Sequence, residues 1–375
     1  MTPTTMQSPS GGIFITRLSG EKTQERAEIL SELHDALPTS NLQAYFADLK
    51  SRPPAWDIET FIEGAMVLSD LIGHKRAAYY DNPLKGPHSL NSFTQSWNKM
   101  HSQHPITMWD QDIRRQCPPT WFNGLIDDNW VLSYRGEAPL SQGLNELLQG
   151  PTTLDCGMWC QFLLWMSLRY LIGDELFDSW IPLKNGRFAL TQMWGDPMND
   201  NGTIGSLLYS FYDEHGQDSQ ARIQTRTVSN HPTYSMKHPG GMGSLQNVTQ
   251  VDGRNLVFDP SAPQNVLSET ELKQKLLDDF NAPQDSADLE KQLLYKLHPS
   301  LVHPHFHPKT FGTLAEEAEK HANDVLDEDE WSVRQEDDVL CLDFNLPRLV
   351  SWIQQNKKIK LVRNSNWRMS RGTAT

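Results

Sequence analysis

The apolar residues of the chain gather most densely between residues 155 and 172, where they fall on nearly every face of a helix. A helix that is apolar all round belongs in the middle of a domain. Thr152, Thr153 or Asp155 can cap its start, and Gly173 can end it. The pattern therefore predicts a buried central helix, with more polar elements packed around it.

Helical patterns also occur on both sides of this central run. Before it, helices are predicted over residues 21–37, which end at a proline, and 57–73, which end at a glycine. After it, the same periodicity returns in "SETELKQKLLDDF", residues 268–280, and "TLAEEAEKHANDVL", residues 313–326. These segments predict helical additions at both ends of the chain.

Three runs have the composition of strands: "ARIQTRTV" at 221–228, "LQNVTQV" at 245–251 and "NLVF" at 255–258. An Asp-Gly pair separates the last two runs and predicts a tight hairpin turn. Helices and strands together indicate the α+β class.

The amino-acid composition and the hydrophobic pattern change at three places along the chain, and these changes predict four regions. Residues 1–12 are rich in Thr, Ser, Pro and Gly and are expected to be disordered. Residues 13–104 are expected to form a helical accessory region, residues 105–265 the α+β core, and residues 266–375 a mostly helical C-terminal region.

The length and the cysteine content of the chain indicate the compartment in which the protein acts. With 375 residues the chain can bury a large core without disulfides, and its four cysteines, Cys117, Cys156, Cys160 and Cys341, are too scattered for a disulfide framework. They are expected to be reduced thiols of an intracellular or cytosol-acting protein.

Charge and hydropathy exclude several partners. The formal net charge is −14 and no Lys/Arg cluster exceeds the short "NKKIKLVR", so neither nucleic acid nor an anionic membrane is an expected partner. The most apolar run contains Arg169 and is short for a bilayer, and the N-terminus lacks the pattern of a secretory signal. We expect a cytoplasmic protein, or a toxin or effector that is secreted by a route independent of a signal peptide.

Two of the four cysteines open the central helix. Cys156 would lie in its first turn, where free backbone N–H groups and the helix dipole favour a thiolate. Cys160 lies one turn deeper and is expected to pack in the core. The alternative is that both cysteines are small core residues.

A nucleophilic thiol needs a base, and the base is usually oriented by a third polar group. The segment 229–263 contains His231 and His238 in a loop rich in Pro and Gly, followed by the predicted hairpin, which ends at Asp259. Such a hairpin can bring a loop histidine, Gln246 and Asp259 to one sheet edge that faces the central helix.

Two motifs in this region resemble known families. "LDCGMWCQF" resembles the nucleophile motif of NlpC-type cell-wall peptidases, in which Asp-Cys opens the central helix. "NVTQVDGRNLVFDPSA" resembles the end of transglutaminase-like domains, where an Asp-Pro-Ser/Thr strand end carries the triad aspartate. Both families have the papain-like fold, so the resemblance implies a papain-like core with Cys156 as nucleophile and Asp259 as orienting acid.

The chain departs from these families at the base. Where they begin the first strand with the catalytic histidine, this sequence has Ser244 or Gln246, and His238 lies six to eight residues upstream. His238 is the preferred base and His231 the alternative, and a site without a histidine stays open.

Other side chains near the predicted site have two interpretations each. The Gln246 amide can donate to an oxyanion, or it is an exposed strand glutamine. Trp159 and Trp194 can wall a substrate groove, or they belong to the core.

The resemblance implies a thiol acyltransferase that acts on protein carboxamides, as a transglutaminase or a glutamine deamidase does, without a cofactor. A cysteine peptidase or cell-wall amidase of the same fold is the first alternative. A non-enzymatic binding or scaffold protein is the second. The expected partner is a protein or peptide substrate, and the sequence does not determine the oligomeric state.

Four histidines in "LHPSLVHPHFHP" lie close together: His298, His303, His305 and His307. Alternate positions of an extended chain can share a metal. The prolines and the lack of a matching cysteine or carboxylate favour a polar surface loop, so no metal site is predicted.

Overall fold

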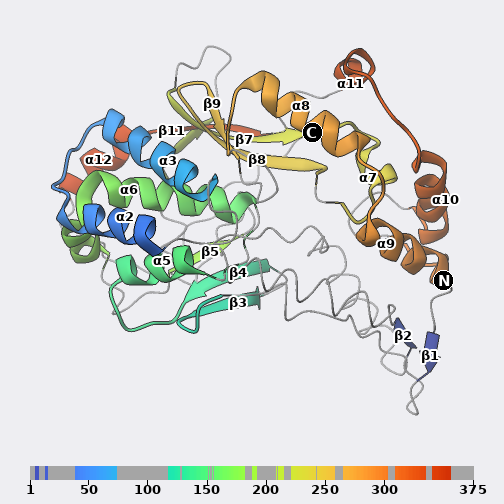
Figure 1. Cartoon of the computed structure of the whole chain (residues 1–375), viewed down its shortest axis with the longest axis horizontal. Helices are drawn as coiled ribbons and strands as arrows, with labels where there is room; N and C mark the ends of the chain where they lie inside the picture. The colour runs from blue at the N-terminus through green and yellow to red at the C-terminus, as the bar shows by residue number, and fades with distance from the viewer. Residues whose placement is uncertain are drawn as a thin grey trace.

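The computed structural model describes most of the core and both sets of flanking helices. The described residues are 5–7, 13–15, 39–73, 117–126, 129–150, 152, 154, 156–181, 188–191, 208, 210–214, 221–241, 243–257, 265–302, 309–334 and 340–355. They form helices and antiparallel sheets, so the predicted α+β class is confirmed (Figure 1).

The helices lie before, within and after the sheet region of the chain. They are α2 (Thr39–Ser51), α3 (Ile58–Gly73), α5 (Leu140–Gln149), α6 (Cys156–Trp180), α7 (Tyr234–Lys237), α8 (Glu269–Asn281), α9 (Ser286–Leu297), α10 (Phe311–His321), α11 (Glu328–Arg334) and α12 (Leu346–Gln355). The helices predicted over 57–73, 268–280 and 313–326 correspond to α3, α8 and α10. The segment 21–37 lies outside the described residues.

The strands form three sheets. They are β1 (Thr5–Gln7), β2 (Ile13–Ile15), β3 (Trp121–Ile126), β4 (Asn129–Tyr134), β5 (Ala189–Thr191), β6 (Tyr212–Glu214), β7 (Ile223–Ser229), β8 (Leu245–Val251), β9 (Arg254–Leu256), β10 (Val266–Leu267) and β11 (Leu340–Phe344). The largest sheet has the order β10-β9-β8-β7-β11-β6, the second is β3-β4-β5, and β1 pairs with β2. The β1–β2 pair lies partly in residues 1–12, where composition predicts disorder.

The predicted hairpin is present with its turn. β8 runs from Leu245 to Val251, as the sequence predicts, and pairs antiparallel with β9. Between them Asp252 and Gly253 have φ values of 47° and 74°. Two consecutive residues with positive φ form a type I′ turn, whose twist matches that of the flanking strands.

Helices cover both faces of the six-stranded sheet (Figure 1). On one face Val228 of β7 and Val248 of β8 pack with the leucines of α8. On the other face Ile223 and Val251 join the large cluster built around α6. Because successive side chains of a strand alternate between faces, the odd-numbered residues of β8 face α6 and the even-numbered residues face α8.

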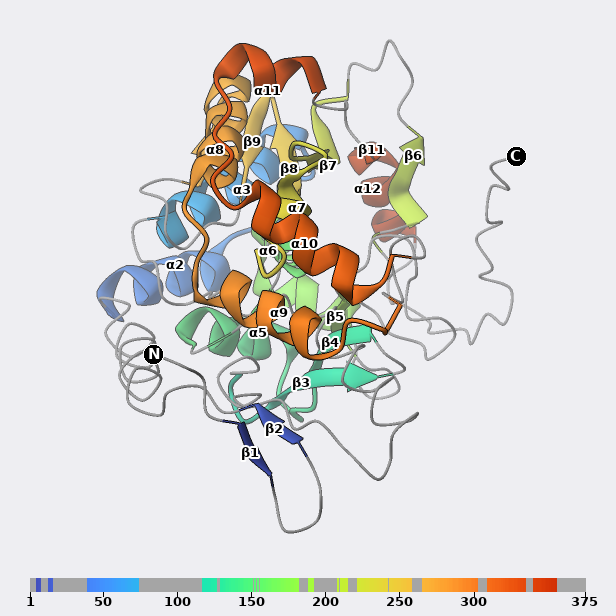
Figure 2. The same ribbon diagram turned by 90° about the vertical axis from the view of Figure 1, so that its right-hand side faces the viewer.

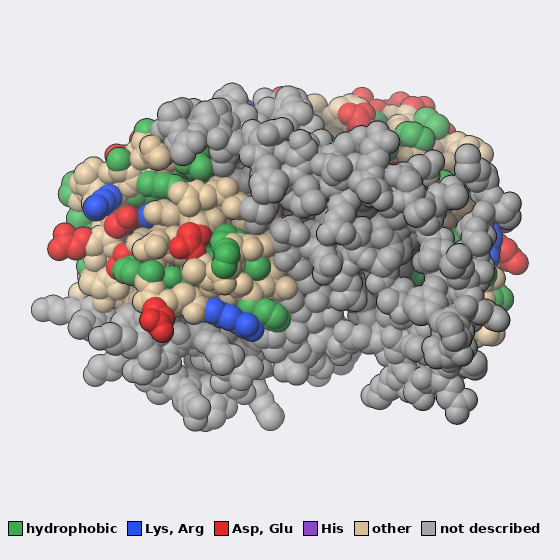
Figure 3. Space-filling view, turned by 60° about the horizontal axis from the view of Figure 1, so that its bottom comes forward, with side chains coloured by type: hydrophobic (Ala, Val, Ile, Leu, Met, Phe, Trp, Pro, Cys, Tyr) green, Lys and Arg blue, Asp and Glu red, His purple; other side chains and the backbone are tan. Residues whose placement is uncertain are grey.

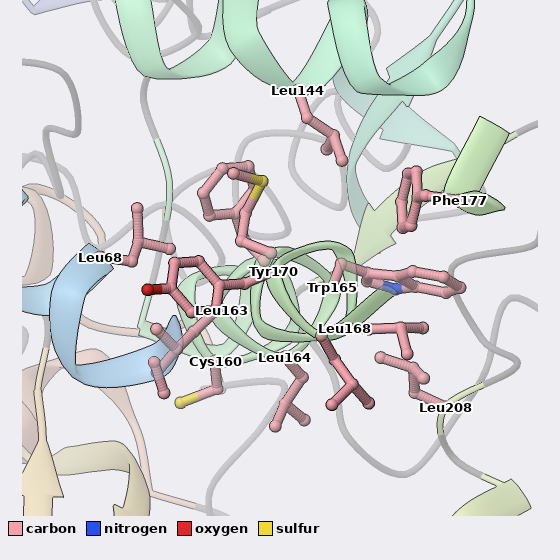
Figure 4. Packing of buried hydrophobic residues seen from close by; sticks show 14 of the residues in the cluster. Leu68, Leu144, Cys160, Leu163, Leu164, Trp165, Leu168, Tyr170, Phe177 and Leu208 are labelled. Carbon is pink, nitrogen blue, oxygen red and sulfur yellow. The ribbon is translucent and has the colours of Figure 1, made fainter. Parts of the chain in front are cut away.

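The central helix is buried over its whole first part, as predicted. Every residue from Gly157 to Gly173 is buried, and in Figure 4 the side chains of α6 point outward in all directions, toward Leu68 of α3 on one side and Leu144 of α5 on another. The core side chains packed in this way hold α6 rigidly relative to the sheet.

The ends of α6 differ in part from the sequence prediction. Gly173 interrupts the helix with a φ of 71°, as its predicted role at the helix end requires, but a second helical segment continues to Trp180. A Cβ at Gly173 would lie 2.1 Å from the carbonyl oxygen of Arg52, so only glycine fits. Thr152 is not a cap of α6, because its hydroxyl donates to the Leu147 carbonyl oxygen of α5.

The C-terminal helices pack beside the loop that precedes β8. Figure 2 shows α9 and α10 side by side, and α10 also contacts α7. No described helix is both long and apolar enough to cross a membrane. On the face shown in Figure 3, the Lys and Arg side chains of the described residues do not gather into a patch.

Candidate functional site at the start of the central helix

Cys156 is the first residue of α6 and is half-buried, whereas Cys160, one turn further on, is fully buried in the main cluster. The start of a long helix presents N–H groups without intrahelical partners, and these lower the pKa of a thiol placed there. None of the four cysteines, all of which the structure describes, is in a disulfide. Cys156 is thus the more accessible of the two thiols, and Cys160 is part of the hydrophobic core.

The strand opposite the thiol contributes Asn247. Its side-chain nitrogen Nδ2 donates to the Sγ atom of Cys156 at 3.2 Å. Asn247 is the third residue of β8 and is only partly buried. The amide N–H of Asn247 donates a hydrogen bond to the sulfur. A thiolate accepts such a hydrogen bond more strongly than a neutral thiol does, so this contact favours the thiolate.

Thr227 of β7 supports the asparagine from the neighbouring strand. Its hydroxyl donates to Asn247 Oδ1 at 2.7 Å, and the two residues face each other in the antiparallel register. Cys156, Asn247 and Thr227, which we call the thiol cluster, therefore form one chain of contacts from the helix start into the sheet.

Gln246 lies on the other side of the sheet. It neighbours Asn247 in β8 and pairs in register with Val228, which packs against α8. Strand alternation therefore directs Gln246 away from α6, and its side chain is buried. The amide that reaches the sulfur belongs to Asn247, and an oxyanion role for Gln246 is not supported by this placement.

His238 is buried, and both of its ring nitrogens face acceptors outside the thiol cluster. Nδ1 lies 2.9 Å from Asp288 Oδ2, and Nε2 lies 3.0 Å from the Phe280 carbonyl oxygen. Asp288 Oδ1 also accepts from the Gly240 backbone N–H at 2.8 Å. Both ring nitrogens of His238 therefore have hydrogen-bond partners outside the thiol cluster.

Lys237, the residue before this histidine, is also buried and points to the same place. Its ammonium Nζ donates to the carbonyl oxygens of Phe280, at 2.7 Å, and Asp324, at 2.6 Å. Phe280 lies in the last turn of α8, where cationic groups complement the helix dipole. Burial lowers the pKa of Lys237, and the nearby carboxylates partly oppose this.

These contacts hold the "KHPGG" loop, residues 237–241, against α8 and α9. Lys237, His238 and Asp288, with the Phe280 carbonyl, form a closed polar cluster that ties the loop to α8 and α9. We call it the loop anchor. The role of His238 as base stays a prediction, and to act on the thiol its ring would have to give up its contact with Asp288 or Phe280.

The remaining predicted site residues lie as follows. His231 is buried, with Nδ1 2.7 Å from the Thr233 hydroxyl and its ring edge-on to Phe280. Trp159 is fully buried and stacks on Phe162, so it belongs to the core. Asp259 and Trp194 lie outside the described residues, and the role of Asp259 stays a prediction.

Of the four clustered histidines only His298 is described, and it is buried at the end of α9. Its backbone N–H donates to the Leu294 carbonyl oxygen. No group of three or more His, Cys, Asp or Glu among the described residues is arranged to hold a metal ion.

Asn247 and Thr227 were not predicted from the sequence. The strand "LQNVTQV" has polar residues at both odd and even positions, although helices cover both faces of the sheet. Its alternation therefore does not show which side chains face the cysteine.

Comparison of the chain with protein-family models, with curated proteins and with solved structures finds no match in any of the three. The class of the protein is therefore argued from its own residues.

Proposed function

We propose that the chain is a papain-like thiol enzyme, with Cys156 as the nucleophile, that acts on carboxamides of a protein or peptide substrate. The observation that carries this proposal is the placement of a half-buried thiol at the first residue of α6, with the Asn247 amide directed at its sulfur. The rigidly packed body of α6 supports it further, because a nucleophile needs a fixed position.

The proposed reaction runs in two balanced steps. The Cys156 thiolate attacks the carboxamide carbon and a carbon–sulfur bond forms. The carbon–nitrogen bond then breaks, and the nitrogen takes up one proton from the protonated base and leaves as ammonia. A primary amine or water then attacks the thioester and gives one proton back to the base, and the carbon–sulfur bond breaks to restore the thiolate. The product is a cross-link or a deamidated side chain. Backbone N–H groups at the start of α6 are placed to bind the oxyanion.

The proton carrier in this scheme is the predicted His238, oriented by the predicted Asp259. His238 can act only after its ring exchanges an anchor contact for one with the substrate or the thiol. Such an exchange would open a buried polar cluster. The proposed setting remains the cytoplasm, or export as an effector.

The decisive experiment measures the alkylation of Cys156 by iodoacetamide against pH, with the modified position located by fragmentation mass spectrometry. A nucleophilic Cys156 reacts with an inflection well below the free-thiol pKa of about 8.5. Incorporation of a fluorescent primary amine into a glutamine-rich protein, with release of ammonia, then tests acyl transfer, and Cys156→Ala serves as control. An inflection at the free-thiol value would contradict the proposal.

One observation favours a second candidate, a non-enzymatic binding or scaffold protein. The strand residue at the sulfur is Asn247 and not a histidine, and both ring nitrogens of His238 have structural partners. Under this alternative Cys156 shows ordinary alkylation and no acyl transfer. A cysteine peptidase or amidase shares the proposed nucleophile and differs in cleaving a backbone or cell-wall amide.

A further inference from the structure

We infer that Thr227 is a positioning residue of the thiol site, which holds the Asn247 side chain with its N–H groups toward Cys156. This inference rests on the proposed function for its consequence in catalysis, and on the hydrogen bonds alone for its geometry. Thr227 Oγ1 donates to Asn247 Oδ1 at 2.7 Å, and Asn247 Nδ2 donates to Cys156 Sγ at 3.2 Å.

The asparagine needs such a support because the two ends of its amide group have similar size and opposite hydrogen-bonding character. With Nδ2 toward the sulfur, the amide stabilises a thiolate. Turned by half a rotation, it would present Oδ1, which repels a thiolate. The hydroxyl of Thr227 donates to Oδ1 in the orientation that presents Nδ2 to the sulfur, so the two hydrogen bonds of the amide support each other there.

Thr227 is well placed to be that donor. It lies in β7, which pairs with β8 on one side and β11 on the other, so its backbone is held in the interior of the sheet. It is buried, and its branched side chain has few rotamers. A hydroxyl that donates to Oδ1 also polarises the amide and strengthens its N–H donor.

The same strand face provides a matched control. Thr249 follows Asn247 by two residues, faces α6 as Asn247 does, and is fully buried. Within the described part of the chain its hydroxyl has no hydrogen-bond partner. Thr249→Val therefore makes the same chemical change as Thr227→Val at another buried position of the sheet. It leaves the hydrogen bonds of the Asn247 amide in place.

The experiment compares Thr227→Val, Thr227→Ser and Thr249→Val with the parent chain, all shown to be folded by circular dichroism and thermal unfolding. The pH dependence of Cys156 alkylation is measured for each. We expect the inflection of Thr227→Val to move upward by as much as about one pH unit, because the thiolate loses part of a charge-assisted hydrogen bond. Thr227→Ser, which keeps the hydroxyl, and Thr249→Val should follow the parent.

Equal inflections in Thr227→Val and Thr249→Val would overturn the inference, as would a shift that serine does not reverse. If Thr227→Val does not fold, Thr227→Ala takes its place in the same comparison. The two proposals fail separately. A parent inflection near 8.5 contradicts the nucleophile, whereas the difference between the two valine variants tests Thr227 whatever the parent value.

Discussion

Two polar clusters lie on either side of the start of β8, and they differ in how completely they are closed. The thiol cluster faces α6 and contains a half-buried cysteine and a partly exposed asparagine. The loop anchor lies before β8, and its lysine, histidine and aspartate side chains are buried and bonded to one another or to carbonyl oxygens.

The difference shows that residue type alone does not identify a reactive site. The loop anchor holds the residue types that serve most often as acids and bases, yet each group has structural partners. Buried charges require full hydrogen bonding, so the anchor must stay closed to be stable. The thiol cluster consists of less conspicuous residues, but its cysteine is only half-buried.

The largest expected effect comes from opening the loop anchor. Asp288→Ala removes the acceptor of His238 and of the Gly240 and Asp285 N–H groups, and His238→Ala removes one of the donors to the buried Asp288 carboxylate. Each variant should lower the free energy of unfolding by about 3–5 kcal/mol, because the remaining member of a buried pair loses its side-chain partner. Urea denaturation measures this.

A matched control for that prediction lies on the surface. His321 Nδ1 is 2.5 Å from Asp324 Oδ2, in a pair that solvent reaches. His321→Ala should cost at most about 1 kcal/mol. If His238→Ala leaves stability unchanged and abolishes acyl transfer, His238 is the base and the anchor is not structural.

The second effect concerns the pH dependence of stability, through a buried lysine that interacts with Asp288 of the loop anchor. Lys291 of α9 is buried, and burial lowers its pKa from 10.5 to about 8, against the attraction of Asp288. Between about pH 8 and 10.5 the unfolded chain holds more protons at this position, so the free energy of unfolding should rise with pH.

The measurement compares the parent with Lys291→Met between pH 7 and pH 10. The stability of the parent relative to the variant should rise by about 2 kcal/mol over this range. Parallel curves would show that Lys291 keeps an ordinary pKa in the folded chain.

A smaller effect distinguishes the two cysteines by packing. Cys160 is fully buried in the α6 cluster, where Figure 4 shows it among the core side chains. Cys160→Ala should lower the free energy of unfolding by about 1 kcal/mol, through lost contacts and a small cavity. Activity should persist, and its loss in a folded Cys160→Ala protein would transfer the nucleophile role to Cys160.

The smallest effect on stability is expected at the thiol cluster itself. Cys156→Ala removes a half-buried thiol and one hydrogen bond from Asn247, so stability should change by at most about 0.5 kcal/mol. The fast-reacting thiol and any acyl transfer should disappear. A large loss of stability would mean that Cys156 is a structural residue, which favours the binding-protein alternative.

Much of the local structure followed from the sequence. The continuous apolar run predicted α6, "LQNVTQV" predicted β8, and the Asp-Gly pair predicted the turn after it. The start of α8 is likewise local, since Ser268 and Glu271 form a capping box within four residues. These features depend on neighbours in the chain, and such neighbours are visible in a sequence.

The candidate site was predictable only at its cysteine. The position of Cys156 depends on the start of one helix, which is a local property. The partners of His238 depend on a contact across fifty residues, with Asp288 of α9. A loop histidine next to glycines suggested a mobile base, but the packing of α8 and α9 gave it acceptors on both sides.

The sequence by itself therefore determined the secondary structure around the site and the placement of a thiol at a helix start, because hydrophobic period, caps and turns act over a few residues. The tertiary structure alone decided that Asn247 and not Gln246 faces that thiol, and that Thr227 lies beside it. Strand pairing and the choice of sheet face are set by the packing of α6 and α8 on opposite sides, and a strand with polar residues on both faces does not encode which side is which.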